Sequence, residues 1–347
     1  MLAAVFEGNG KLVLKDRPKP QIKQNNEVLL KVGGVGICGT DLHILQIPAA
    51  HPAKVGIILG HEFAGTIMEI GDGVKDFKPR DRVIVNPHPG CGVCRECRRG
   101  RPDLCSRLYS AELPNHPNTI GIFSDGAMTS FVVVPEYSLY KIGYDVPFHL
   151  AALAEPLSCV VSAVDKLHVQ PGDNVVILGA GPIGLFFTCM LKACGASNII
   201  VSEIADDRQV AAKNCGATLV VDPNKEDLNE VVKRKLGDGA DVVVEAVGPM
   251  INQAISVVRN GGTILQFGHD ELARPNIPVA EIVRKEIIIK GAFIGKFSFE
   301  KVAKILESNS LPLDKVVSHR LPLSKVHEGL DLLRKRKALK VILYPEE

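Results

Sequence analysis

Three short groups of residues, far apart in the sequence, together offer the ligands of a catalytic metal ion. Cys38 is followed by a glycine, His61 and Glu62 are adjacent, and Glu155 lies much further along the chain. A thiolate, an imidazole and carboxylates are the side chains that bind catalytic zinc. Each group alone has a simpler explanation, since a free cysteine is usually a small buried apolar residue. Together they suggest that the fold brings a thiol, an imidazole and carboxylates to one catalytic zinc site beside a nucleotide.

Two residues just after Cys38 could move a proton. Thr40 carries a hydroxyl and His43 an imidazole, and both groups suit the removal of a proton from a substrate hydroxyl. His51, His88 and His116 lack such neighbours, and we expect them at the surface or behind the site.

A second metal site is predicted by four cysteines in the pattern C-x2-C-x2-C-x7-C, namely Cys91, Cys94, Cys97 and Cys105. Four thiolates at this spacing predict a tetrahedral zinc site without an open position, which is structural and not catalytic. The main alternative is an iron–sulfur cluster, but Ser106 replaces the proline of bacterial ferredoxin sequences and the chain has no second cysteine group. We interpret the surrounding arginines as a solvated surface.

A glycine-rich segment predicts a dinucleotide site. Gly179, Gly181 and Gly184 follow an apolar run and precede a helical pattern, which is the context that a phosphate-binding turn requires. Glu203 ends the next apolar run, 19 residues past Gly184, where a carboxylate accepts hydrogen bonds from ribose hydroxyls. We therefore expect NAD in preference to NADP, although Arg208 nearby could tolerate the extra phosphate.

Composition places the chain among soluble two-domain proteins. It has 347 residues, of which 46% are hydrophobic and 23% charged, and its formal net charge is +2. So small a surplus gives no reason to expect nucleic acid or a membrane as partner. The N-terminal residues lack the pattern of a signal peptide, so we expect a cytoplasmic protein. Four of its nine cysteines crowd into residues 91–105, which indicates metal binding rather than disulfides, and Cys159, Cys189, Cys194 and Cys215 are expected to be small buried apolar residues.

The pattern of apolar residues in the sequence changes near residue 150. Before it, short alternating apolar runs separated by Gly, Pro and Asp predict a β-rich or barrel-like unit. After it, strands alternate with helices, which predicts parallel βαβ units in a doubly wound sheet. The six predicted strands of that sheet are Asn174–Gly179, Asn198–Glu203, Thr218–Asp222, Asp241–Glu245, Gly262–Gly268 and Glu286–Ala292.

With these motifs in place, the chain resembles the zinc-dependent medium-chain dehydrogenase/reductase (alcohol dehydrogenase) family over essentially its full length. Ala154-Glu155-Pro156 stands where other alcohol dehydrogenases have a zinc cysteine, so the chain is most similar to the polyol and threonine dehydrogenase branch. The resemblance implies a GroES-like β-barrel catalytic domain of residues 1–152 and 291–347, with the structural zinc lobe at about 88–107. It also implies an inserted Rossmann NAD-binding domain of residues 153–290, with the catalytic zinc in the cleft between the domains.

The resemblance further assigns roles to single residues. Thr40 and His43 match the family's proton relay, and Cys38 and His61 its constant zinc ligands, with Glu62 and Glu155 competing for the remaining position. Its cofactor positions correspond to Gly179, Gly181, Ile183, Gly184, Glu203, Arg208, Gly268 and Phe293. Family members are commonly tetramers, so we expect a homotetramer or homodimer with the strand Glu286–Ala292 at a contact.

The expected activity is oxidation of the secondary alcohol of a polyol or polyol phosphate to a ketone, with NAD as acceptor. L-threonine 3-dehydrogenase and 2,3-butanediol dehydrogenase activities are the alternatives within the family. A zinc-free enoyl or quinone reductase would not need Cys38, His61 and Glu155. A protein of another class, such as a non-enzymatic redox sensor that binds NAD and zinc, would bind NADH without turning over any alcohol.

Overall fold

The structure is a computed structural model that describes residues 1–108 and 119–345, so the predicted position of His116 lies outside the described residues. The chain forms two compact units, one of Met1–Ser158, Gly295–Ser310 and Val317–Glu347, the other of Cys159–Ile294 and Leu311–Val316. The domain boundaries predicted from the sequence, at residues 152 and 290, differ from the boundaries of these units by a few residues. The first change of unit lies inside helix α4 (Ala154–Val164), where the helical pattern continues without a break.

The first unit is built on a seven-stranded sheet in which β14, β15, β3, β4, β5 and β7 follow one another and β6 also pairs with β3. All neighbours are antiparallel except β14 and β15, which are parallel. A separate hairpin of β1 and β2 completes the β structure. The strands are β1 (Leu2–Gly8), β2 (Lys11–Asp16), β3 (Glu27–Gly36), β4 (Glu62–Ile70), β5 (Arg82–Val85), β6 (Phe131–Pro135), β7 (Leu139–Ile142), β14 (Val317–Pro322) and β15 (Lys340–Tyr344).

Side chains from most of these strands meet in one apolar core. Its fully buried members include Leu30, Val35, Phe63 and Val341, which come from β3, β4 and β15. Because β3 is ten residues long, β6 pairs with its first half and β15 with Val35 and Gly36 at its end, while β4 pairs along nearly its whole length. The helices of this unit are α1 (Gly39–Ile44), α2 (Arg95–Arg98), α3 (Phe148–Ala151), α10 (Phe299–Ser308) and α11 (Val326–Arg334), together with the start of α4.

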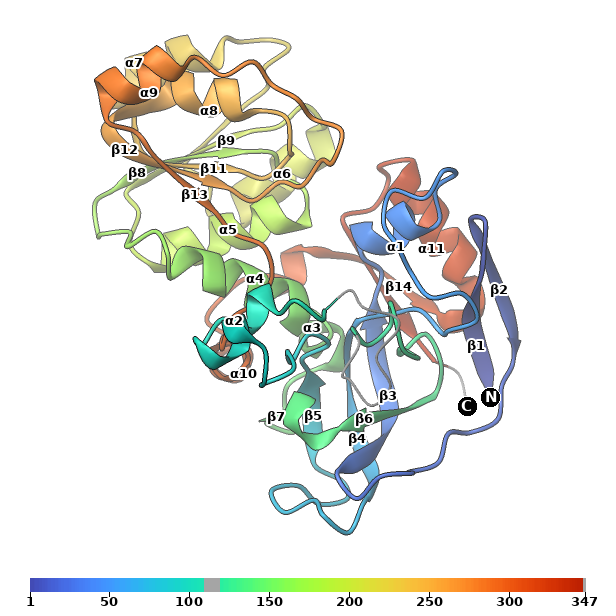
Figure 1. The fold of residues 1–347 in the computed structure, drawn as a ribbon. Helices are drawn as coiled ribbons and strands as arrows, with labels where there is room; N and C mark the ends of the chain where they lie inside the picture. Colours follow the sequence, from blue (N-terminus) through green and yellow to red (C-terminus); the bar gives the residue numbers. More distant parts are fainter. Residues whose placement is uncertain (109–118, 346–347) are drawn as a thin grey trace. The chain divides into compact units, whose positions relative to one another are not determined.

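The second unit is a six-stranded parallel sheet in the order β10, β9, β8, β11, β12, β13. Helices α7, α8 and α9 lie on one face of the sheet, and α5 and α6 lie on the other (Figure 1). The strand order reverses between β8 and β11, and ligands of such sheets bind at this point. The strands are β8 (Asn174–Leu178), β9 (Asn198–Ser202), β10 (Leu219–Val221), β11 (Ala240–Glu245), β12 (Val258–Gln266) and β13 (Ile288–Gly291). The helices are α5 (Pro182–Ala193), α6 (Asp206–Asn214), α7 (Leu228–Leu236), α8 (Ile251–Val257) and α9 (Val279–Lys285).

The fold class predicted from the sequence is confirmed, with its barrel-like β unit and its six-stranded doubly wound sheet. All six predicted strands of the second sheet are present, with ends that differ by one to four residues. Among the described residues, no helix is both long enough and apolar enough to cross a bilayer.

Candidate active site and zinc centres

Cys38 is held at the start of helix α1, immediately after the long strand β3. It is the N-cap of the helix, and its backbone N–H donates to Asp41 Oδ2 at 2.9 Å. The side chain of Asp41 therefore satisfies a backbone donor that the helix start leaves free. Asp41 itself is fully buried, so the turn that presents the Cys38 thiol has a fixed geometry.

His61 lies at the entry to strand β4, where a glycine shapes the backbone. Gly60 has φ +99°, and a Cβ at this position would lie 2.8 Å from Met128 Cγ and 2.9 Å from the Met128 nitrogen. Only glycine fits there, because the conformation is left-handed and the backbone of residue 128 is too close. The imidazole of His61 is 3% exposed, and its Nδ1 lies 3.8 Å from Asp41 Oδ1. The two atoms are too far apart for a hydrogen bond, so the carboxylate faces this ring nitrogen as a nearby charge only.

Cys38, His61 and Glu62 form a compact group of possible metal ligands. One donor atom from each lies within 4.8 Å of the other two. Glu62 is the first residue of β4 and is 1% exposed, and one of its oxygens accepts from the buried ammonium of Lys340. The Lys340 Nζ also donates to the Ile37 carbonyl at 3.0 Å.

Glu155 is not a member of this compact group, although it is buried in the same unit. Its Oε1 lies 3.4 Å from His88 Nε2, and the other ring nitrogen of His88 lies 3.3 Å from Thr119 Oγ1. The Thr119 hydroxyl donates to the Leu108 carbonyl at 3.0 Å, so Thr119 is itself held in place beside the His88 ring. This chain of contacts fixes the His88 ring and directs Nε2 at the carboxylate.

The electrostatics of the group fit a divalent cation. Three buried carboxylates, Asp41, Glu62 and Glu155, surround the Cys38–His61 pair, and Lys340 is the buried lysine among them. Although burial opposes its charged form, the negative charge at Cys38 raises the pKa of His61 to about 10. Burial likewise opposes ionisation of Glu155, yet its hydrogen bond with His88 lowers the pKa of this carboxyl. A site with so many anions attracts positive charge, and the soft thiolate with an imidazole suits zinc.

The two predicted relay residues lie on the short helix that begins after Cys38. The Thr40 hydroxyl oxygen is 3.6 Å from Cys38 Sγ, and both Thr40 and His43 are partly exposed. Residues three apart on a helix lie on the same face, so Thr40 and His43 line one side of α1.

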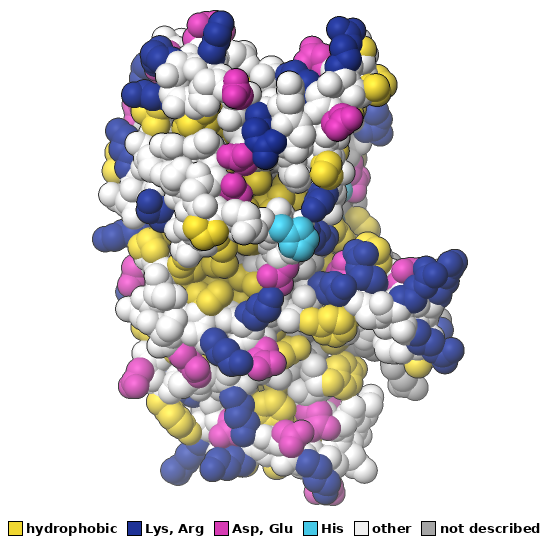
Figure 2. Space-filling model, turned by 90° about the vertical axis from the view of Figure 1, so that its left-hand side faces the viewer, with side chains coloured by type: hydrophobic (Ala, Val, Ile, Leu, Met, Phe, Trp, Pro, Cys, Tyr) yellow, Lys and Arg dark blue, Asp and Glu magenta, His cyan; other side chains and the backbone are white. Residues whose placement is uncertain are grey.

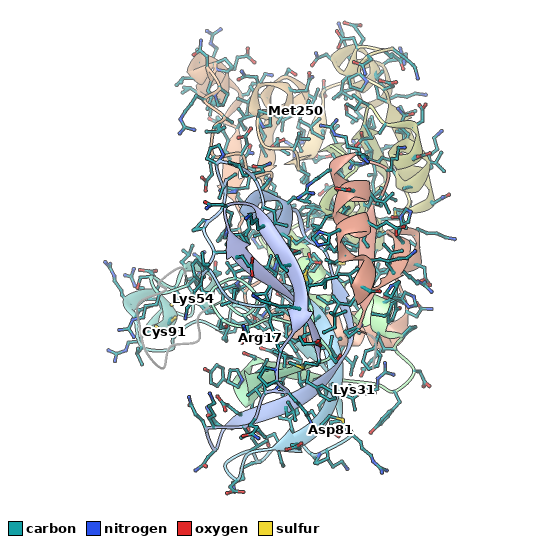
Figure 3. All side chains as sticks on the ribbon, turned by 90° about the vertical axis from the view of Figure 1, so that its right-hand side faces the viewer. Arg17, Lys31, Lys54, Asp81, Cys91 and Met250 are labelled. Atoms are coloured by element: carbon teal, nitrogen blue, oxygen red, sulfur yellow. The ribbon has the colours of Figure 1, made fainter. Side chains whose placement is uncertain are left out.

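Four thiols gather on the lobe that carries helix α2. Sγ of Cys91 is 4.0 Å from that of Cys97, and Sγ of Cys94 is 3.9 Å from that of Cys105. A tetrahedral zinc with Zn–S bonds of about 2.3 Å places its sulfurs about 3.8 Å apart, so the spacing fits the metal. In Figure 3, Cys91 lies on a lobe that projects to one side of the strands of the first unit.

The phosphate-binding turn of the second unit has the geometry that its glycines predict. Gly179 follows β8 with φ +94°, Gly181 is the N-cap of α5, and Pro182 begins the helix. A Cβ on Gly184 would collide with the Gly179 carbonyl, so helix and strand pack directly against each other. The amino end of α5 thus faces the crevice beside β8, and Ile183 lies in its first turn.

Glu203 and Arg208 lie beside this turn. Glu203 Oε2 accepts from the Ala180 backbone N–H at 2.8 Å, and its Oε1 accepts from the backbone N–H groups of Ile204 and Ala205 at 2.9 and 3.0 Å. The carboxylate therefore fixes the turn as well as the end of β9. A Cβ on Gly181 would lie 3.9 Å from an Arg208 guanidinium nitrogen, and the buried Nε of Arg208 has no partner among the described residues.

The remaining predicted cofactor positions lie at the carboxyl ends of β12 and β13. A Cβ on Gly268 would collide with the Gly248 backbone, so the loops after β11 and β12 touch at this glycine. The Phe293 ring is 42% exposed and lies 6.2 Å, centroid to centroid, from His269.

Two residues of the site, Asp41 and Lys340, were not predicted to take part in it, and His88 was expected either at the surface or behind the site. Asp41 stands behind His61, Lys340 holds Glu62, and His88 pairs with Glu155. Asp41 follows Cys38 by three residues, which is a spacing that indicates a capping residue. His88 precedes the first lobe cysteine by three residues, and Lys340 is 278 residues from its partner, so nothing local in the sequence identifies either role.

A dinucleotide turn in one unit, with a thiol, imidazole and carboxylate group and a four-thiol lobe in the other, defines a zinc-dependent nicotinamide dehydrogenase. The comparisons agree with this class. The family model for the alcohol dehydrogenase GroES-like domain matches residues 24–144, and that for the zinc-binding dehydrogenase domain matches residues 182–308. The chain belongs to the zinc-dependent medium-chain dehydrogenase family.

Individual relatives extend over nearly the whole chain. D-xylulose reductase A of Aspergillus oryzae is 30% identical over 99% of this chain and 96% of its own length. L-threonine 3-dehydrogenase of Bacillus velezensis is 34% identical over 96% of this chain and 95% of its own. Among solved structures, a zinc-binding dehydrogenase of Sinorhizobium meliloti 1021 bound to NADP gives a TM-score of 0.92 at 30% identity, covering 99% of each chain. Galactitol-1-phosphate dehydrogenase of Escherichia coli gives 0.88 at 26% identity, covering 99% of this chain and all of the other.

The chain is therefore a zinc-type alcohol or polyol oxidoreductase that uses a nicotinamide cofactor and a small-molecule substrate. Over the face drawn in Figure 2, Lys and Arg side chains are interspersed with Asp and Glu, in keeping with the net charge of +2.

Proposed function

We propose that this enzyme oxidises the secondary hydroxyl of a polyol or polyol phosphate to a ketone and transfers the hydride to NAD. The observation that carries the proposal is the group of Cys38, His61 and Glu62, whose donor atoms lie within 4.8 Å of one another. Relatives that act on such compounds, the Aspergillus D-xylulose reductase and the galactitol-1-phosphate dehydrogenase, support the choice of substrate. The threonine dehydrogenase relative favours a second candidate, because threonine also carries a secondary hydroxyl.

Each residue of the group has a distinct role in this proposal. Cys38, His61 and Glu62 hold zinc, which supplies a Lewis acid that lowers the pKa of the substrate hydroxyl. Thr40 accepts the proton of that hydroxyl, and His43 passes it from the same helix face to solvent. Glu155, held by His88, accepts a hydrogen bond from a further substrate hydroxyl or from water, and competes with Glu62 for the metal.

The lobe of Cys91, Cys94, Cys97 and Cys105 holds a second, structural zinc in this proposal. Four thiolates fill a tetrahedral shell, so no position remains for a substrate. None of the nine cysteines is paired in a disulfide, and thiols in this state are kept in a reducing compartment. We therefore place the enzyme in the cytoplasm.

NAD is the proposed acceptor because Glu203 puts a carboxylate at the end of β9. A negative charge beside the adenine ribose repels the additional phosphate of NADP. Arg208, whose guanidinium lies near Gly181, contacts the same cofactor in this proposal. The preference is measured as the ratio of kcat/KM for the two cofactors with one alcohol, and a ratio in favour of NADP contradicts it.

The substrate proposal is tested by following NADH formation by its absorbance with sorbitol, arabinitol, their phosphates, inositol, threonine and 2,3-butanediol. We expect the highest kcat/KM with a polyol or its phosphate. Dialysis against a strong chelator and the variant Cys38→Ala should each abolish turnover, whereas Cys194→Ala, far from the site in sequence and in the other unit, should retain it. Full activity after either treatment contradicts the zinc mechanism. Binding of NADH without turnover of any alcohol indicates a redox sensor.

We also propose that the enzyme is a homodimer or homotetramer. β13 is an edge strand of its sheet, and among the described strands it pairs on one side only, with β12. Its residues Ile288 and Ile289 are 49% and 41% exposed, and Val279 and Val283 of α9 are 65% and 69% exposed. An exposed edge with apolar side chains can pair with the same edge of a second copy.

A further inference from the structure

Lys340 is a buried lysine inside the group of residues assigned to the catalytic metal. It lies on the last strand, β15, and is 3% exposed. Lysine is rarely buried to this extent unless its charge is compensated. Its ammonium donates to Oε2 of Glu62, a proposed metal ligand, and to the carbonyl of Ile37, 3.0 Å away, which precedes the ligand Cys38. The lysine thus contacts this group at two points, at Glu62 and at the residue before Cys38.

Three strands are arranged to let this ion pair form. In the sheet, Gly36 of β3 lies opposite Ile342 of β15 on one side and opposite Glu62 of β4 on the other. A Cβ on Gly36 would collide with Glu62 Oε2 and lie 3.1 Å from Lys340 Cε. The missing side chain of Gly36 therefore makes the space in which the lysine reaches the carboxylate.

We propose that Lys340 is a positioning residue that keeps Glu62 a one-oxygen ligand of the metal. The ammonium takes Oε2 and leaves Oε1 free to bind. This inference rests on the proposed assignment of Cys38, His61 and Glu62 as metal ligands.

The consequence is an open coordination position. A carboxylate that binds through both oxygens fills two positions on zinc, whereas a catalytic site needs three protein ligands and one free position for the substrate oxygen. A cation on the second oxygen also draws electron density away from the carboxylate, so the metal keeps more of its Lewis acidity. Without Lys340, both oxygens of Glu62 turn to the metal and the open position closes.

The test uses the full chain with cobalt(II) in place of catalytic zinc, because four-coordinate cobalt absorbs visible light more strongly than five-coordinate cobalt. We expect Lys340→Met to bind one cobalt at this site with weaker visible bands than the wild type, and to lose about tenfold or more in kcat. Lys340→Arg keeps a cation and should retain the wild-type spectrum. Lys304→Met is the matched control, because Lys304 pairs with Glu300 at 2.9 Å on the exposed surface of the same unit.

A second variant reaches the same pair without changing either partner. Gly36→Ala introduces the Cβ that collides with Glu62 Oε2, so it should weaken the cobalt bands in the same way. Cobalt-loaded Lys340→Met or Gly36→Ala with a wild-type spectrum overturns the inference, and a loss of thermal stability alone indicates a merely structural lysine. Where neither variant folds, a crystal structure of the wild-type zinc enzyme decides, since Glu62 bound through both oxygens contradicts it. A wild-type chain that binds no metal at Cys38 and His61 contradicts the proposed function instead.

Discussion

The Thr40 hydroxyl oxygen lies 3.6 Å from Cys38 Sγ, which places it beside the proposed metal ligand. We predict that Thr40→Val lowers kcat by about 100-fold, because a positioned acid–base group typically contributes 10²–10⁴ to a rate. Valine has nearly the shape of threonine, so the fold and the metal content should not change. Steady-state kinetics on metal-analysed protein measures the effect.

Thr40→Ser provides the control for this prediction. Serine keeps the hydroxyl and should keep kcat within a few-fold of the wild type. A Thr40→Val enzyme with full zinc content and unchanged kcat shows that the proton leaves by another route.

For single residues, the metal ligands are easier to predict from the sequence than the residues that hold those ligands in place. Cys38 and His61 lie in short motifs whose residue types match zinc chemistry, so both could be proposed without a structure. Lys340 could not, because its role depends on β15 pairing with β3 and on the space left by Gly36. His88 could not either, since only the fold brings it within 3.4 Å of Glu155, 67 residues away. Long-range pairing decides which charged residues meet.

At the scale of single elements, the turn before strand β5 carries backbone strain. Arg80 has φ +76°, a conformation that costs a residue with a side chain about 1–2 kcal/mol relative to glycine. Its backbone N–H donates to the Ile67 carbonyl at 2.8 Å, so the turn is held in this conformation. We predict that Arg80→Gly stabilises the protein by about 0.5–1 kcal/mol, after the greater freedom of glycine in the unfolded chain is subtracted.

Thermal unfolding of the two forms side by side measures this gain. Arg80→Ala removes the same guanidinium but keeps the strain, so its melting temperature should stay near that of the wild type. An Arg80→Gly melting temperature at or below that of Arg80→Ala contradicts the prediction.

In the second unit, Asp241 of β11 accepts hydrogen bonds from residues at the starts of β8 and β12. Its Oδ2 accepts from the Asn174 backbone N–H at 2.8 Å, and its Oδ1 accepts from Arg259 Nε at 2.6 Å. Partial burial opposes ionisation, but these two donors hold the pKa of Asp241 below its ordinary value of 3.8. We predict that Asp241→Asn costs about 1 kcal/mol at pH 7, since the arginine is partly exposed and solvent screens its charge.

The pH dependence of this loss follows from the direction of the pKa shift. A carboxyl whose pKa is lowered in the folded state stabilises the fold above its unfolded pKa, and the benefit disappears as pH falls through the folded pKa. The difference in melting temperature between wild type and Asp241→Asn should therefore be constant from pH 8 to about 5 and shrink below about 4. Asp238→Asn, at an exposed position, should show no difference. A difference that grows in acid contradicts the assignment.

The elements themselves were predictable where one physical signal was strong. Strands β8, β9 and β11 are continuous apolar runs buried on both faces, and such runs are visible in the sequence. The start of β12 could not be predicted in this way. The strand begins at Val258, before Gly261 and Gly262, and its pairing with β11 shifts register in this part. Glycines usually end a strand, and here the bulge lets the strand continue through them.

For the whole molecule, the change in the pattern of apolar residues near residue 150 indicates two units. Neither unit is one continuous stretch of the chain. Residues 295–310 and 317–347 return to the first unit, while 311–316 belong to the second. The return is required by the sheet, because β15 pairs with β3 and inserts Lys340 behind Glu62. A chain that ended after the second unit would lack both the strand and the charge.

The edge strand β13 gives the last prediction. Ile289 is 41% exposed on a strand whose outer side has no neighbour among the described strands, so we expect it to be covered by a second copy of the chain. Light scattering during gel filtration should give two or four times the chain mass of 37.4 kDa. Ile289→Lys should dissociate the assembly, because each contact would then bury an unpaired ammonium. Met68→Lys, at an equally exposed apolar position in the first unit, should not. A wild-type monomer, or an Ile289→Lys protein of unchanged mass, places the contact on another surface.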